Sequence, residues 1–274
     1  MPQSQTQYLL ILTKTYPNPS AKYRETTCVA ALTDKGEMRR IYPVPFRFLD
    51  GSHQFQKWEW IRARLTPAKD DKRPESFKID TDSIVRPGKR IGTEKQWQER
   101  RAWIEPHMVE GFAALEARRQ RTGETLGFIR PTRLLQLVIT SLKETEWTDG
   151  DRVKLLQEGL FDSEAARKRA PLKKIPYSFH YEYECLGADG VERQRHMLTD
   201  WEVGALFWRC QHDYGKGWEI YFRKKLEEEF AAKDLMFLMG TVHRFPDKWL
   251  IVGLVYPPAQ PPGSPKVRQL GLDL

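Results

Sequence analysis

The chain has 274 residues, of which 40% are hydrophobic and 30% charged, with 45 lysines and arginines against 37 acidic residues. This length and hydrophobic content are enough for one large domain or two small ones with packed cores, which excludes an unstructured tail. No apolar run approaches the roughly 20 residues of a membrane-spanning helix. Residues 1–7 lack the charged flank and apolar segment of a secretory signal, so we expect a cytoplasmic protein with no membrane partner.

The basic surplus accompanies many aromatic residues: nine Trp, ten Tyr and thirteen Phe. Lysine and arginine neutralise phosphates, and exposed rings stack on unpaired bases, so the combination favours a nucleic-acid-binding surface. Most aromatic residues of a folded chain nevertheless belong to its core, and many charges only solvate the surface. Composition therefore permits nucleic-acid binding and identifies no reaction.

The cysteines are few and odd in number, which argues for reduced thiols rather than a disulfide framework. Cys185, His196, Cys210 and His212 could be gathered into a metal site, but their spacing matches no standard zinc pattern. We therefore predict neither a metal nor a cofactor.

The first third of the chain is rich in strands. Residues 8–13 are an apolar run of strand formers, and residues 28–33 and 38–42 form a hairpin around the turn Asp34-Lys-Gly-Glu37. Residues 57–65 alternate as a half-buried strand does, and residues 76–79 follow a proline-bounded loop. This pattern predicts a small barrel rather than an α/β sheet.

The middle of the chain is more helical. Helix-forming residues at 94–101 and 108–121 are separated by Pro106, and residues 134–139 predict a further strand. From residue 149 the apolar density falls, and residues 165–176 contain five basic residues and no acid. We predict a basic inter-domain linker at residues 149–176.

The C-terminal part repeats the strand-rich pattern. A hairpin at residues 179–198 is followed by Asp200, a typical N-cap, and by helices at 202–211 and 218–233; strands at 235–243 and 248–256 close the domain. The predicted organisation is an N-terminal barrel domain with a helical insertion, a basic linker, a C-terminal OB-like barrel with two helices, and a proline-rich extended tail. The corresponding ranges are 1–148, 149–176, 177–258 and 259–274.

Several strings resemble a family of poorly characterised bacterial proteins with a dual OB-type barrel. They are Cys28-Val-Ala-Ala-Leu, Arg39-Arg-Ile-Tyr-Pro-Val-Pro-Phe-Arg47, Lys57-Trp58, Arg73-Pro-Glu-Ser-Phe-Lys78, Phe237-Leu-Met-Gly-Thr and Trp249-Leu-Ile-Val-Gly-Leu-Val-Tyr-Pro-Pro258. The resemblance spans nearly the whole chain and implies an α+β, mainly β fold with two small OB-like β-barrels, each with helical insertions. It also implies single-stranded nucleic acid as ligand and antiviral or mobile-element systems as the setting. It carries over no assigned functional residues.

Two segments offer candidate binding residues. Strand alternation puts Arg40 and Tyr42 on one face, where they either pair a phosphate ligand with a stacking ring or leave Tyr42 capping the core and Arg40 solvated. The stiff loop at residues 73–78 presents Arg73, Ser76 and Lys78 as phosphate donors.

Catalytic patterns are weaker. Glu75 and Lys78 have the wrong separation for a metal-dependent nuclease. His180, Glu182 and Glu184 share one strand face, where they either bind a metal or pair with neighbouring arginines and lysines. Phosphate-cradling glycine loops and a Gly-x-Ser-x-Gly elbow do not occur in the sequence.

We therefore expect an accessory protein that binds single-stranded DNA or RNA within a larger complex, and not a stand-alone enzyme. The alternatives are a metal-dependent nuclease and a protein-interaction module of a multi-subunit complex. No catalytic residue is predicted. The residues expected to contact nucleic acid are Arg39, Arg40, Tyr42, Arg47, Lys57, Trp58, Arg73, Ser76, Lys78, Arg167, Lys168, Arg169, Lys173 and Lys174.

Overall fold

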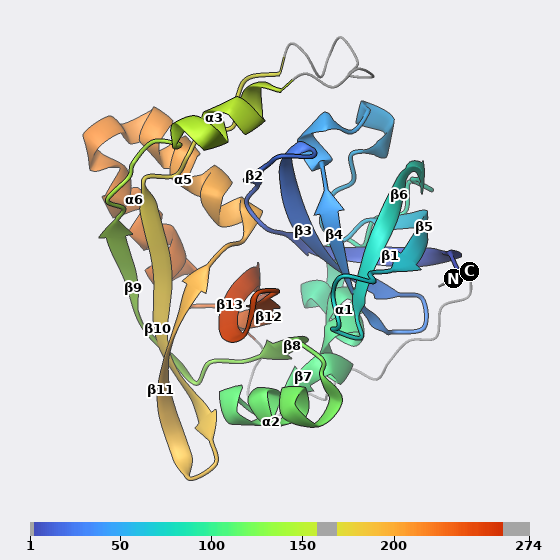
Figure 1. Cartoon of the computed structure of the whole chain (residues 1–274). Helices are drawn as coiled ribbons and strands as arrows, with labels where there is room; N and C mark the ends of the chain where they lie inside the picture. The colour runs from blue at the N-terminus through green and yellow to red at the C-terminus, as the bar shows by residue number, and fades with distance from the viewer. Residues whose placement is uncertain (1–2, 158–168, 260–274) are drawn as a thin grey trace. The chain divides into compact units, whose positions relative to one another are not determined.

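The computed structural model describes residues 3–157 and 169–259 (Figure 1). The chain divides into two compact units. Unit 1 comprises Met1–Arg90 and Ser141–Tyr177, and unit 2 comprises Ile91–Thr140 and Ser178–Leu274. Among the residues that the structure describes, no helix combines the length and the apolar composition needed to cross a membrane.

Unit 1 is built from strands, two short 3₁₀ turns and one helix. These are β1 (Gln5–Lys14), β2 (Asn18–Ser20), β3 (Arg24–Thr33), β4 (Met38–Val44), η1 (Phe46–Phe48), η2 (Gly51–His53), β5 (Trp60–Pro67), β6 (Ser76–Val85) and α3 (Asp149–Leu156). The hairpin β3–β4, β5 and β6 lie where the sequence predicts them.

The five long strands of unit 1 close into a barrel. β1 pairs with β5 through its first half and with β3 through its second half, past an irregularity between Ile11 and Thr13. The closed order is β1-β3-β4-β6-β5-β1, and every pair is antiparallel except β4–β6. Numbered along the chain, this order is 1-2-3-5-4-1, the Greek-key barrel of the OB-fold.

Alternation along the strands fills the barrel. On β5, Ile61, Ala63 and Leu65 are fully buried, while Arg62 and Arg64 between them are exposed. Side chains on a strand point to opposite faces in turn, so the apolar set fills the interior. The half-buried strand predicted at residues 57–65 is confirmed.

Unit 2 has the same plan with more helix. Its elements are α1 (Glu94–Ile104), η3 (Glu105–His107), β7 (Met108–Val109), α2 (Phe112–Thr122), β8 (Leu126–Ile129), β9 (Arg133–Ser141), β10 (Tyr177–Gly187), β11 (Gly190–Leu198), α5 (Trp201–Tyr214), η4 (Gly215–Gly217), α6 (Trp218–Arg223), the π-helical segment η5 (Lys224–Glu229), β12 (Met236–Val242) and β13 (Phe245–Val255). Asp200 caps α5 as predicted, because its side chain accepts from the backbone N–H of Glu202.

The second sheet repeats the first topology. Its order is β8-β12-β13-β11-β10-β9, with β7 beside β8. β8 and β9 are consecutive and separated only by residues 130–132, so together they act as one bent first strand that pairs at both ends of the sheet. β11 and β13 are parallel, as β4 and β6 are in unit 1. α5 and α6 connect the third and fourth strands.

The core of unit 2 is strongly aromatic. Alternate residues of β10, Phe179, Tyr181, Tyr183 and Cys185, are buried. The buried hydroxyl groups have partners, since Tyr181 donates to the carbonyl of Leu226 at 2.8 Å and Tyr183 lies 3.0 Å from His196 Nδ1. A buried phenol without a hydrogen bond is costly, so the Tyr181 contact positions β10 against η5 and the Tyr183 contact positions it against β11.

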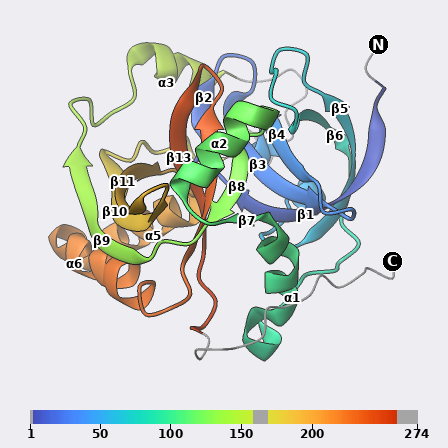
Figure 2. The same ribbon diagram turned by 90° about the horizontal axis from the view of Figure 1, so that it is seen from below.

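The mainly β fold with two OB-like barrels is confirmed, whereas the structural units divide the chain differently from the predicted ranges. Residues 91–140 belong to unit 2, because the short strand β8, which the sequence did not predict, begins the second barrel before the basic segment. Residues 141–177 belong to unit 1, where α3 contacts β2 and β3 and lies beside β2 in both Figure 1 and Figure 2. Within the predicted linker 149–176, residues 158–168 lie outside the described residues, as do residues 260–274 of the predicted tail.

Candidate nucleic-acid interface

An OB barrel binds oligonucleotides on the face of its second and third strands and on the loops after strands 1 and 4. In unit 1 these elements are β3, β4, residues 15–23 and residues 68–75. Three of the predicted residues, Arg39, Arg40 and Tyr42, are on β4, and Arg73 is in the second loop. Ser76 and Lys78 begin β6.

Burial removes part of this set from the surface. Arg40 is 4% exposed, with Nη2 3.6 Å from Oε1 of the equally buried Glu75. The cause is the parallel pairing of β4 with β6, which brings Glu75 beside Arg40. Both predicted alternatives for Arg40, groove-facing and solvated, are corrected to a buried ion pair. Ser76 and Trp58 are buried as well.

Other predicted residues are paired with neighbouring carboxylates. Arg39 donates to Glu37 at 2.5 Å, and its guanidinium lies 4.6 Å from the Phe77 ring. The Arg73 guanidinium donates to Asp71, from Nε to Oδ1 at 2.9 Å and from Nη2 to Oδ2 at 2.6 Å. The exposed Lys78 pairs with Asp70 at 2.9 Å. Each of these charges is at least partly neutralised locally.

A different group of cations gathers around Glu25, a carboxylate at the start of β3 that is 2% exposed. Arg47 Nη1 lies 2.9 Å from Glu25 Oε2. Burial raises the pKa of Glu25, and the positive charges of Arg47, Arg169 and Arg24 act against that rise. We call these four residues the Glu25 cluster; it contains three guanidinium groups and one carboxylate.

Aromatic and backbone contacts hold the cluster in place. Arg24 has φ 61° and its guanidinium lies 4.8 Å from the Phe48 ring. Arg24 donates to the carbonyl of Gln157, and Arg47 donates to the carbonyl of Ala170. The described part of the basic segment thus lies against the start of β3.

Two further contacts anchor that segment. Tyr16 donates its hydroxyl to the carbonyl of Lys173 at 2.9 Å, and Trp147 Nε1 donates to the carbonyl of Leu172 at 2.7 Å. Leu172 itself is buried. The basic residues Arg169 and Lys173 keep exposed side chains.

Tyr42 completes a mixed basic and aromatic surface. Its ring is 51% exposed, and its hydroxyl lies 3.4 Å from Oγ1 of Thr26, the residue after Glu25. Successive side chains on a strand point to opposite faces, so Thr26 and Tyr42 lie on the other face of β3 from Glu25. We call the Glu25 cluster and Lys173, together with Tyr42 on the adjoining strand, the arginine face. It can offer guanidinium groups to phosphates and one ring to a base.

The remaining predicted residues lie elsewhere. The carbonyl of Lys57, before β5, accepts from Arg90 at 3.3 Å, and Lys174 donates to the carbonyl of Glu146 at 2.9 Å. Arg167 and Lys168 lie outside the described residues. Of the predicted set, the structure therefore places Arg47 and Arg169 around Glu25, with Lys173 on the same basic segment and Tyr42 on the neighbouring strand.

Sequence reasoning missed Arg24, Glu25 and Phe48. The only local signal is an arginine and a glutamate next to each other at the start of a predicted strand, a common pattern on solvated surfaces. Glu25 interacts with Arg47, 22 positions away, and with Arg169, more than 140 positions away. A local sequence pattern cannot connect residues so far apart.

On the corresponding sheet face of unit 2, arginines pair with neighbouring glutamates. Arg133 pairs with Glu184 at 2.9 Å, and Arg195 lies 3.8 Å from Glu182. Arg193 also donates to Glu182. The sequence left two interpretations of His180, Glu182 and Glu184, a metal site or pairing with basic neighbours. Both glutamates are paired with arginines. Within residues 3–157 and 169–259, no group of three or more His, Cys, Asp or Glu side chains is arranged to hold a metal ion.

Two family models cover most of the chain. The domain of unknown function DUF8758 matches residues 5–106, and the domain of unknown function DUF8757 matches residues 108–272. The chain belongs to the DUF8757 family. The second match contains every strand of the second barrel and also the segment that contributes to unit 1.

Curated proteins give no match to the chain. Among solved structures, it is similar to a chain described under "Structure and Conformational Change of a Replication Protein A Heterotrimer Bound to ssDNA", with 7% identity and a TM-score of 0.24. The alignment covers 93% of this chain and 66% of that chain.

Proposed function

We propose that the protein binds single-stranded DNA or RNA on the arginine face, as an accessory component of a larger complex. The observation that carries the proposal is the Glu25 cluster: Arg47 pairs with a buried carboxylate, and the positive charges of Arg24 and Arg169 also act on it. Arg24 and Glu25 begin the second strand of the barrel, one of the elements that OB-folds use for oligonucleotides. The resemblance to bacterial dual-OB proteins is what suggests an antiviral or mobile-element setting.

The electrostatics of the cluster suit an extended polyanion. Glu25 is buried, so it fixes Arg47 without presenting its own charge to a ligand in solvent. The exposed side chains of Arg169 and Lys173 add positive charge at the edge of the cluster. Contacts of this kind release counterions from the nucleic acid, which supplies sequence-independent affinity.

The preference for single strands follows from Tyr42. A half-exposed ring can stack on a base only if the face of that base is unpaired and accessible, as in a single strand. The remaining contacts are to the backbone, so the arginine face is expected to discriminate weakly between sequences.

The test is fluorescence anisotropy with labelled single-stranded DNA and RNA over a series of salt concentrations. Arg169→Ala and Lys173→Ala should each weaken binding and reduce the log–log salt slope by about 0.7, because each removes one phosphate contact. Tyr42→Ala should cost on the order of 1–3 kcal/mol while leaving the slope unchanged, because stacking releases no counterions.

Arg64→Ala is the matched control. Arg64 lies on β5, its side chain is 54% exposed and it pairs with Asp80, so it has the charge and exposure of an interface arginine without lying on the arginine face. The proposal is wrong if the folded wild-type protein binds neither nucleic acid at low salt, or if Arg64→Ala weakens binding as much as Arg169→Ala does. A protein-interaction role would then take precedence.

A further inference from the structure

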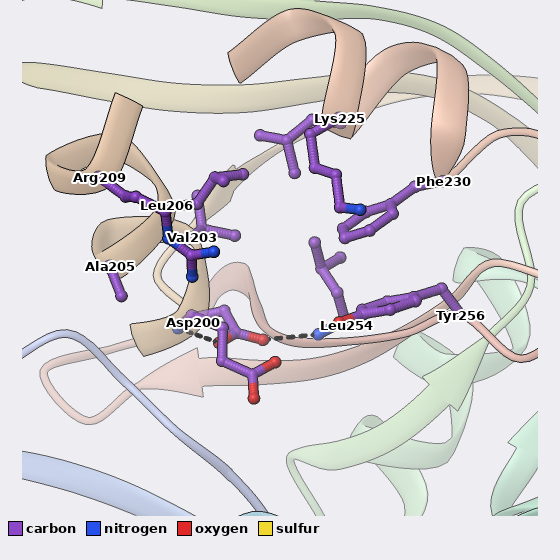
Figure 3. A pocket seen from close by; sticks show the side chains of 11 residues that line it. Asp200, Val203, Ala205, Leu206, Arg209, Lys225, Phe230, Leu254 and Tyr256 are labelled. Atoms are coloured by element: carbon purple, nitrogen blue, oxygen red, sulfur yellow. Dashed lines mark hydrogen bonds between the residues drawn. The ribbon is translucent and has the colours of Figure 1, made fainter. Parts of the chain in front are cut away.

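Unit 2 contains a pocket of about 350 Å³ that the arginine face does not use. Figure 3 shows it between α5, which contributes Leu206 and Arg209, and the facing helical segment, which contributes Lys225; Leu254 and Tyr256 lie at the end of β13. Its volume is at the lower end of the range typical of small-molecule sites.

One wall of the pocket is the π-helical segment η5. The backbone N–H of Phe230 donates to the carbonyl of Lys225 at 3.2 Å, five residues back, as a π-helix requires. π-helical turns are rare and occur frequently at functional sites. Here the wide turn places both Lys225 and Leu226 on the pocket wall, while the Leu226 carbonyl is held by Tyr181.

The polar groups divide into an acidic and a basic set. Asp200 is 2% exposed and its two carboxylate oxygens accept from the backbone N–H groups of Glu202 and Leu254, each at 2.8 Å. These bonds fix a carboxylate at the base of the pocket. Arg209 is exposed and makes no ion pair with any residue that the structure describes. Lys225 shares its charge with Glu229 at 2.5 Å.

Between these groups the lining is flat and apolar. The rings of Phe230 and Tyr256 stack with centroids 4.0 Å apart and planes 17° apart, and Val203, Leu206 and Leu254 complete the walls. Because the two rings stack on each other, they form one flat wall, and a planar ring system packs against such a wall better than a branched aliphatic group of the same volume.

We propose that this pocket binds a nucleoside monophosphate unit, with the base between the apolar walls, its amino or ring N–H donors at Asp200, and its phosphate at Arg209. Asp200 and Arg209 are nine residues apart along α5, which separates their Cα atoms by about 13 Å. The Arg209 side chain leans towards the N-terminus of α5, as Figure 3 shows, so its guanidinium lies nearer to Asp200 than the Cα separation. The pocket thus offers an acceptor for ring donors and a cation for an anionic group on the same ligand.

The same chemistry is present in a free nucleotide and in the terminal nucleotide of a strand. The experiment is calorimetric titration of the full chain with AMP, GMP, CMP and UMP and with a 5′-phosphorylated dinucleotide. Adenosine and inorganic phosphate, the two parts of AMP, are titrated separately for comparison. At least one mononucleotide should bind at least tenfold more tightly than either of its parts. Tighter binding of the dinucleotide would identify a strand end as the source.

Three variants test whether the nucleotide binds in this pocket. Arg209→Ala should weaken binding at least tenfold, and Leu206→Trp should abolish it by filling the pocket. Lys224→Ala is the matched control, because Lys224 is exposed on the same π-helical segment but does not line the pocket, and its affinity should stay within twofold of the wild type. Circular dichroism verifies that each variant is folded.

The proposal is overturned if neither mononucleotides nor the dinucleotide bind, if folded Arg209→Ala binds like the wild type, or if an amino acid or dipeptide binds more tightly than every nucleotide. It does not depend on the arginine face. Mononucleotide binding that survives Arg169→Ala supports the pocket whether or not the arginine face binds strands.

Discussion

Arg47 donates from Nη1 to Glu25 Oε2 across 2.9 Å, although 22 residues separate the two in the chain. The contact joins the turn after the third strand of the first barrel to the beginning of its second strand. Because Glu25 is 2% exposed, the arginine is held in one position rather than moving freely in solvent. The same guanidinium donates through Nη2 to the carbonyl of Ala170, so it also fixes the basic segment.

Arg47→Ala should therefore destabilise unit 1 strongly. Removing one partner of a buried pair leaves the other charge without its direct partner, which typically costs about 3–5 kcal/mol. The double variant Arg47→Ala/Glu25→Gln should recover most of this loss, because no charge is then left buried. Urea unfolding followed by circular dichroism measures both. Arg64→Ala, which breaks the exposed pair with Asp80, should cost less than about 1 kcal/mol and serves as the control.

A second prediction concerns the attachment of the basic segment to the barrel. Tyr16→Phe removes only the hydroxyl that donates to the Lys173 carbonyl at 2.9 Å. The expected cost is about 1 kcal/mol of unfolding free energy, as for a typical hydrogen bond. Hydrogen exchange should become faster for residues 169–174 and stay unchanged on β12. Unchanged exchange in both places would show that this contact does not hold the segment.

Most strands of the barrels were accessible from the sequence because alternation is a local signal. Ile61, Ala63 and Leu65 alternate with arginines, and Phe179, Tyr181 and Tyr183 alternate with polar residues, so each strand predicts its own buried face. Strand β8 gives no such signal, since all four of its residues are buried. A four-residue apolar run is ambiguous between a strand and a helix, and missing it shifted the expected domain boundary.

The candidate site was less accessible because charge pairing is a tertiary property. The alternation of β4 predicts that Arg40 points outward. The parallel pairing of β4 with β6 places Arg40 opposite Ser76, however, and buries it against Glu75. Arg47 and Arg169 were predicted from charge alone, and only the fold shows that Arg47 contacts Glu25 and that the charge of Arg169 acts on the same carboxylate. Sequence identified several of the basic residues, whereas long-range contacts determine which of them lie together.

Lowering the pH should reduce the stability of the second barrel, because His196 is buried in its neutral form. Burial lowers the pKa of His196 to about 4, with the neighbouring His180 contributing, whereas an unfolded histidine titrates near 6.5. Between these values the unfolded chain binds more protons than the folded one, so stability is complete above about pH 6.5 and is lost as the pH falls towards 4. From about pH 7 to pH 5 this one group should account for a loss of roughly 2 kcal/mol.

His196→Gln tests this pH dependence, because glutamine can accept from Tyr183 but does not titrate. Urea unfolding at about pH 7, 6 and 5 should show a pH-dependent loss smaller by roughly 2 kcal/mol in the variant. An identical loss in the two proteins would mean that His196 is protonated equally in the folded and unfolded states. His107, whose pKa burial also lowers to about 4, contributes a loss of the same sign in both proteins.

The last prediction concerns a left-handed turn at the start of α1. Lys95, Gln96 and Trp97 have φ values of 48°, 56° and 64°, a conformation that costs an L-residue with a side chain roughly 1–2 kcal/mol. Trp97 is held in it by packing, with its ring 5.7 Å from Tyr256 and 4.5 Å from the Arg100 guanidinium. Lys95 is exposed, so Lys95→Gly should relieve strain without losing packing and raise the unfolding free energy by about 1 kcal/mol.

Gln98→Gly is the matched control for Lys95→Gly. Gln98 is equally exposed and three residues further along the same element, but its backbone is right-handed helical. Glycine there should lower the unfolding free energy by about 0.5–1 kcal/mol, because it adds backbone entropy to the unfolded chain without relieving strain. The two substitutions are chemically alike and should have opposite signs in urea unfolding. If Lys95→Gly destabilises as much as Gln98→Gly does, residue 95 is not held in a left-handed conformation in solution.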